Sequence, residues 1–229
     1  MPSLKTMVRV EFTQSSILGD EPEYFQRRIK GNIYGQAEVE GREVDIPVGT
    51  MELVYVDVLA AIIRGISLLD FFDYDAVIDE YCSVMYDPET LEYSESAQKI
   101  LGEGVFQLNT LILHRIMIHA KHRGKKIGQA ALRTAIETLS QGCGAVAVMP
   151  KPFQNEAKSK GLFHELVENQ LVDFEQDPEK ARENLSLYYR RLGFEKLPGT
   201  NLLILNPSNP MPTLSQLGCP EDGIYELQY

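Results

Sequence analysis

Alternation of apolar and polar positions predicts that the first third of the chain is antiparallel β-structure. Residues 6–13, 28–39 and 44–58 alternate or carry runs of β-branched side chains, which is typical of strands. Glu40, Gly41 and Arg42 separate the second and third segments and predict a hairpin turn.

The pattern becomes helical between residues 59 and 101, with a break expected at Asp87–Pro88. Residues 70–103 contain ten acidic side chains against one basic side chain, Lys99. The simplest interpretation is a solvated face. The alternative is a rim that attracts a cationic amine or a basic peptide.

A β-α-β unit is predicted in the centre of the chain. Residues 105–119 are rich in Leu and Ile and indicate a central strand, and an Ala- and Leu-rich helix follows over residues 125–140. Residues 141–144 end that helix. Residues 145–149 are wholly apolar, so we expect a strand that is buried on both faces and lies near the preceding one.

Two further helices and two short strands are expected after Pro150. One helix is predicted over residues 156–170, and Asp177 and Pro178 are an N-cap and first helical residue for the other. The apolar stripe of that second helix comprises Ala181, Leu185, Tyr188 and Leu192. Gly193 ends it, Phe194 begins a strand, and residues 202–205 form the predicted final strand. The tail, residues 206–229, has four prolines and is expected to lie over the surface or reach a neighbouring subunit.

Composition and charge narrow the class of protein. The 229 residues are 44% hydrophobic, as in folded globular proteins, and the net charge of -11 disfavours general binding to nucleic acid or anionic lipid. The three cysteines are far apart and indicate a reducing compartment. The N-terminus lacks the apolar core of a signal peptide, and three charged residues interrupt the most apolar stretch, residues 54–72. A cytoplasmic location is expected.

The turn between the central strand and its helix carries the candidate chemistry. Free amides at a helix N-terminus beside small residues form a site for phosphate groups. The residues of this turn are Arg123, Gly124, Lys125, Lys126, Ile127, Gly128 and Gln129. The pattern has neither a Walker Gly-Lys-Ser/Thr ending nor the three glycines of a dinucleotide site, so it indicates another phosphate-bearing ligand.

This turn resembles the acetyl-CoA signature of the GCN5-related N-acetyltransferase (GNAT) superfamily, Arg-Gly-x-Gly-Ile-Gly. Arg123, Gly124, Ile127 and Gly128 match, whereas Lys126 stands where the family usually has its middle glycine. The backbone amides are expected to bind phosphate if Lys126 keeps helical angles.

A second resemblance lies at the end of the last predicted helix. Tyr189, Gly193 and Phe194 match the family's Tyr-x-x-x-Gly-Phe, and the resemblance extends over residues 111–205. Before residue 111 the chain differs, because its helical stretch follows the third strand and not the first. The resemblance implies an α/β fold of the α+β type: a mixed, mainly antiparallel sheet flanked by helices over residues 1–206, an acidic helical insertion at residues 59–104, and a tail at 207–229.

The resemblance also implies a reaction, direct transfer of an acetyl group from the cosubstrate acetyl-CoA to a primary amine. Two strands would splay apart so that the backbone of Ile116, Met117 and Ile118 binds the pantetheine arm, with the Ile118 amide near the oxyanion. Tyr189 would protonate the CoA thiolate. His114 stands where many members carry a Glu base, and Glu52 is the reserve candidate.

Other interpretations of these residues remain open. His114 is also explained as a packed strand-end residue, and Tyr188 is assigned to the core while Tyr189 faces the cleft. His114, His119 and His122 do not predict a metal site, because the first two point to opposite strand faces and no thiolate is near. The basic stretch over residues 111–136 could also be an RNA-binding patch, but it lacks aromatic residues for stacking on bases.

Two alternative functions are retained. One is a non-catalytic CoA-binding regulatory or assembly module, and the other is an acyltransferase that uses a longer acyl-CoA. The acceptor is expected to be a small-molecule or peptide amine, with no nucleic-acid or membrane partner, and the family resemblance implies a homodimer.

Overall fold

The computed structural model describes residues 3–15, 25–39, 41–102, 105–159, 161 and 170–228. The fold is mixed α+β. Its main sheet has eight strands in the order β10-β1-β2-β3-β6-β7-β9-β8, and every neighbouring pair is antiparallel except β6 and β7. The predicted mixed, mainly antiparallel sheet is confirmed.

Three long strands form the predicted antiparallel start of the chain. They are β1 (Ser3–Ser15), β2 (Gln26–Val39) and β3 (Arg42–Val56), paired in sequence order. Gly41 in the β2–β3 turn has a φ of 74°, a left-handed conformation that glycine adopts without a steric penalty. Glu40 lies outside the described residues.

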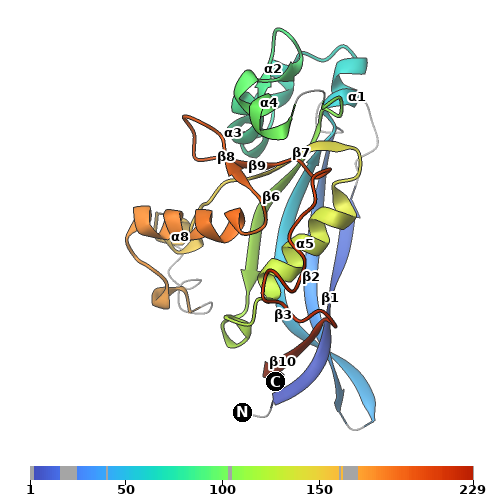
Figure 1. Cartoon of the computed structure of the whole chain (residues 1–229), viewed down its shortest axis with the longest axis vertical. Coiled ribbons are helices and arrows are strands. Elements are labelled where there is room, and N and C mark those ends of the chain that lie inside the picture. Colours follow the sequence, from blue (N-terminus) through green and yellow to red (C-terminus); the bar gives the residue numbers. More distant parts are fainter. Residues whose placement is uncertain are drawn as a thin grey trace.

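The acidic stretch folds as short helices at one end of the sheet (Figure 1). Asp57, Asp75 and Ser94 cap helices in this region through their side chains. The predicted break near Asp87 is a small hairpin of two strands. The elements are α1 (Val58–Ile63), α2 (Leu68–Asp73), α3 (Ala76–Met85), β4 (Tyr86–Asp87), β5 (Glu92–Tyr93) and α4 (Glu95–Leu101).

The central β-α-β unit is confirmed. Strand β6 (Asn109–Ile118) leads through a 3-10 turn, η2 (Ala120–His122), to helix α5 (Ile127–Leu139) and strand β7 (Cys143–Val148). Every residue of β7 is buried, as its apolar sequence predicts. β6 begins later than predicted, at Asn109, where its pairing with β7 starts.

The segment after β7 supplies α6 (Phe153–Ser159), η3 (Leu171–Asp173), α8 (Pro178–Arg190), β8 (Glu195–Lys196) and β9 (Leu203–Leu205). α6 begins before the predicted residue 156, and most of the remainder of the predicted 156–170 helix lies outside the described residues. The Asp177 cap is confirmed, because its carboxylate accepts hydrogen bonds from the amides of Glu179 (3.0 Å) and Lys180 (3.1 Å).

The sequence-based description of the last residues is wrong. Residues 202–205 are not the final strand, because β10 (Ile224–Gln228) pairs with β1 at the edge of the sheet. The tail does not simply lie over the surface, since Leu217, Cys219, Tyr225 and Leu227 are buried in the core beneath α5. Figure 1 shows this tail running back along α5 to the N-terminal strand. The prolines of the tail indicate irregular structure, and the alternation of exposed and buried side chains that marks β10 begins only at Ile224.

No helix within the described residues combines the length and apolarity needed to cross a membrane.

Candidate functional site

The parallel strands β6 and β7 separate halfway along β6. Their pairing ends at Leu113 and Val148, whereas β6 stays paired with β3 as far as Ile118. The outer edge of residues 116–118 therefore has no strand partner in the described chain. β7 itself ends at Val148, so the opening lies beside the part of β6 that extends past β7.

Backbone alternation decides which peptide groups face this opening. The His119 amide donates to Val48 O (2.8 Å) on β3, so Met117, two residues earlier, also directs its peptide groups toward β3. The groups of Ile116 and Ile118 point outward. Ile116 and Ile118 thus fit the predicted backbone contact with a ligand, while the Met117 prediction is wrong for its peptide groups.

A cavity of about 710 Å³ occupies the opening. It is bounded by the end of β6, the following turn, the segment after β7 and one side of α8. The volume of the cavity and its place beside the ends of two parallel strands are typical of small-molecule sites. The predicted residues that line it are His114, Ile116, Met117, Ile118, Arg123, Gly124, Lys126, Ile127, Gly128, Gln129 and Tyr189. Lys125 is not among the lining residues.

The turn is left-handed at two positions. Gly124 has a φ of 77° and Lys126 a φ of 66° as N-cap of α5, so the condition set in the sequence analysis, helical angles at Lys126, is not met. Lys126 takes up the conformation that favours the glycine usual in the family, at a cost of about 1 kcal/mol. The amides of residues 124–128 have no acceptor among the described residues, so the N-terminal cradle still forms.

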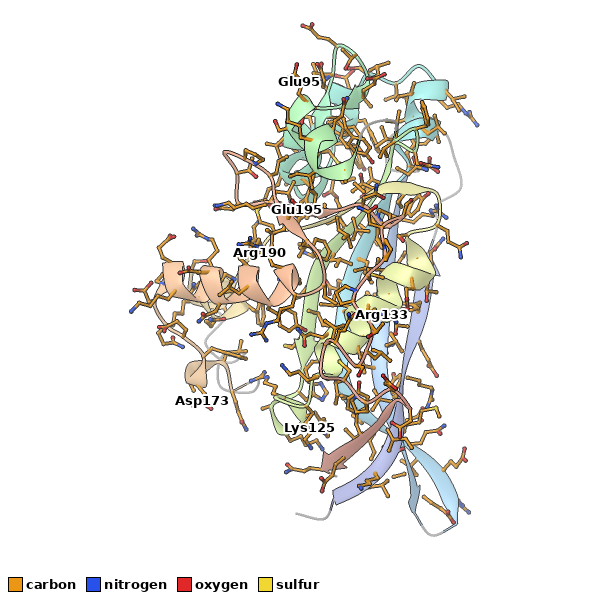
Figure 2. All side chains as sticks on the ribbon, in the orientation of Figure 1. Glu95, Lys125, Arg133, Asp173, Arg190 and Glu195 are labelled. Atoms are coloured by element: carbon orange, nitrogen blue, oxygen red, sulfur yellow. The ribbon has the colours of Figure 1, made fainter. Side chains whose placement is uncertain are left out.

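Interactions with three other segments hold the turn in place. Arg123 Nε donates to Ile118 O (2.8 Å), Nη1 donates to Gln170 O (3.2 Å), and the guanidinium stacks 4.7 Å from the Phe174 ring centroid. Burial lowers the pKa of Arg123, which nevertheless stays charged. Lys125 Nζ donates to Glu226 O of β10. Figure 2 shows Lys125 at this turn and Asp173 on the segment that leads to α8.

The sequence-based division, with Tyr188 in the core and Tyr189 at the cleft, is wrong for Tyr188, because the side chains of both tyrosines of α8 line the cavity. Tyr189 is the more buried of the two, at 5% exposure, and packs edge-on against Phe194. Tyr188 is only half-buried, and its hydroxyl lies 2.6 Å from where a Cβ on Gly128 would be. Both line the cavity, and burial raises the pKa of each phenol, so both are protonated donors at neutral pH.

His114 occupies a β-bulge. The register of β6 against β3 shifts between Arg115 and Leu113, which leaves His114 as the extra residue, and bulges commonly redirect side chains beside sites. His114 is half-buried and lines the cavity. Glu52, the reserve base, is exposed and lies outside the lining, so its prediction is not supported by position.

The acidic stretch does not form a rim around the cavity. None of its described residues, 70–102, lines the cavity, and most of its acids are exposed as a solvated face. One of them, Glu80, forms an ion pair with Lys151 at the cavity wall. The charged lining residues are Arg115, Arg123, Lys126, Lys151 and Glu175.

Sequence reasoning missed the far wall. Lys151 and Phe153 follow β7, and Arg115 lies 4.5 Å from the centroid of Phe153. The available signal was topological, because the carboxyl ends of adjacent parallel strands meet at one edge and their following loops share a site. His122 was considered only as a metal ligand, yet it too lines the cavity.

The described residues contain no group of three or more His, Cys, Asp or Glu side chains placed to hold a metal ion. Comparisons with family models, with curated proteins and with solved structures found no match to this chain.

Proposed function

We propose that this protein is an N-acetyltransferase of the GNAT type, which transfers an acetyl group from acetyl-CoA to a primary amine. The observation that carries the proposal is the separation of β6 from β7 over a cavity of about 710 Å³ that is closed at one end by the Arg123–Gly128 turn. This arrangement and the two sequence motifs support one function together.

The turn and the edge of β6 would bind different parts of the cofactor. The amides of residues 124–128, together with the Lys126 side chain, offer donors and positive charge to the pyrophosphate. The outward amide of Ile118, whose carbonyl already accepts from Arg123 Nε, and the outward carbonyl of Ile116 offer β-type hydrogen bonds to the amides of the pantetheine arm. The arm then runs along β6 toward His114.

Transfer requires two proton movements. The neutral amine attacks the acetyl carbonyl carbon, the outward amide of Ile116, which lies nearer to His114 than the expected donor Ile118, donates to the resulting oxyanion, and the amine proton passes to His114 or to a water that it orients. The C–S bond then breaks, the CoA thiolate leaves, and Tyr189 gives it a proton. Because burial raises the pKa of Tyr189, the phenol is protonated before the C–S bond breaks, and it shares its proton with the departing thiolate through a hydrogen bond.

Calorimetric titration with acetyl-CoA and with CoA tests the cofactor site. We expect micromolar binding that is lost in Arg123→Ala, because this side chain ties the turn to Ile118 and Gln170. Arg182→Ala is the matched control, since Arg182 lies on α8 in a surface pair with Glu179. Absence of binding by the wild-type protein would contradict the proposal, and turnover with an amine would extend it from binding to catalysis.

A further inference from the structure

Two buried polar side chains beside this turn make no hydrogen bond of normal geometry within the described chain. His122 is 0% exposed and Gln129 is 1% exposed. Both terminal atoms of Gln129 have no partner among the described residues, and the ring nitrogens of His122 have only a weak contact with the Pro47 backbone. Both residues line the cavity. We call this pair the polar recess.

Unpartnered polar groups of this kind are costly. Leaving one buried donor or acceptor without a hydrogen bond costs about 1–3 kcal/mol, and native proteins contain few of them. Gln129 is the one polar residue among the buried positions of α5, and positions on the same face, such as Leu132 and Ile136, are apolar, so a Leu or Met would be expected in its place. A glutamine here is therefore explained best by a ligand that supplies its partners.

The recess presents uncharged donors and acceptors. Burial and the nearby Lys121 and Lys125 lower the pKa of His122 to about 4, so its ring is neutral at neutral pH and carries one donor and one acceptor. The Gln129 carboxamide likewise carries both. An amide group, with one C=O and one N–H, complements such a pair, whereas a phosphate offers only acceptors.

We infer that His122 and Gln129 bind an amide of the pantetheine arm through their side chains, in addition to the backbone of β6. This inference rests on the proposed function, because it takes CoA as the occupant of the cavity. It adds to that function a side-chain subsite that selects an uncharged, amide-bearing chain over other phosphate-linked groups.

Gln129→Met tests the inference with two readouts that move in opposite directions. We expect the CoA dissociation constant to rise about tenfold, the effect of losing about one good hydrogen bond to a ligand. The thermal midpoint of the ligand-free protein should stay equal or rise, because two unpartnered atoms are removed. His122→Leu should act in the same way. Binding of adenosine 3′,5′-bisphosphate, which lacks the arm, should be unchanged in both variants.

Gln98→Met is the matched control. Gln98 lies on α4 away from the cavity, and its Nε2 donates to Tyr93 O (2.7 Å), so the same substitution there should lower the thermal midpoint and leave CoA binding unchanged. Unchanged CoA affinity in Gln129→Met, whatever its thermal midpoint, would overturn the inference and leave the proposed cofactor site unaffected. Failure of the wild-type protein to bind CoA would overturn the proposed function and this inference with it.

Discussion

Buried polar side chains near the two ends of β6 differ in whether they are hydrogen-bonded to other parts of the protein. At the start of the strand, hydrogen bonds connect a cluster of Tyr55, Tyr86, Tyr93, Asn109 and Thr110, which we call the partnered cluster. Tyr86 Oη donates to Leu108 O (2.5 Å), Tyr93 Oη to Asn109 O (3.2 Å), and Asn109 Nδ2 to Tyr55 Oη (2.9 Å). At the far end, the polar recess has no such bonds.

This contrast separates what holds the fold from what binds. The partnered cluster joins the helical region to the sheet, for example through Leu59 N, which donates to Asn109 Oδ1 (3.0 Å). Its groups are satisfied by the protein itself, so they contribute to stability. Groups without protein partners contribute only when a ligand arrives. Substitutions at the two ends should therefore change different measurements.

The largest effect is expected for Tyr189→Phe at the cavity end. Loss of a positioned proton donor should lower kcat about 100-fold, while CoA affinity and the free energy of unfolding stay close to wild type. Steady-state kinetics at saturating acetyl-CoA measure this effect, with Tyr34→Phe on β2 as a control outside the cavity. Equal turnover of Tyr189→Phe and wild type would discard the acid role.

Tyr86→Phe, at the partnered end, should instead lower stability. Removing the hydroxyl leaves Leu108 O and Thr110 Oγ1 without this partner, and the free energy of unfolding should fall by about 1–3 kcal/mol. Urea denaturation gives this value, and CoA affinity measured on the folded variant should not change. A weakened CoA affinity would show that the two ends are not independent.

A smaller effect is expected where the two sequence motifs touch. In Gly128→Ala, the new Cβ would lie 2.6 Å from Tyr188 Oη and displace the ring, so CoA affinity should fall about tenfold, or about 1.4 kcal/mol. Adding Tyr188→Phe removes the clashing oxygen and should restore part of the loss. If the double variant binds no better than Gly128→Ala, the contact does not cause the defect.

The last comparison concerns the dependence of stability on pH. The His122 pKa is about 4 in the folded protein against an ordinary value of 6.5, so between these values the unfolded chain takes up a proton that the folded protein does not. The wild-type protein should lose stability as the pH falls from 6.5 to 4, and His122→Leu should lose less over that window. Urea midpoints at several pH values measure the difference. Parallel curves would contradict the lowered pKa.

Local patterns predicted the β-α-β unit, the Asp177 cap and the turn at residues 123–128 between strand and helix, because each depends on residues close in sequence. They could not predict that Tyr188 lines the cavity beside Tyr189, since the side of α8 that faces the turn is set by packing between distant elements. β10 was missed because its partner, β1, lies at the opposite end of the chain. The burial of Gln129 likewise depends on which distant segments pack against α5. The hydrophobic periodicity of the helix does not reveal those segments.

The attachment of the Arg123–Gly128 turn to β10 has a consequence for folding. Residues 109–148 form a local β-α-β unit, whereas β10 pairs with β1 in a register that joins Ser3 to Gln228, the longest loop closure among the strands. Contacts of such high sequence separation form slowly. Because Lys125 donates to Glu226 O and Cys219 contacts Lys126 O, we expect the turn to become ordered only when the two ends of the chain have paired. Binding competence would then appear in the last kinetic phase of refolding, after most of the sheet has formed.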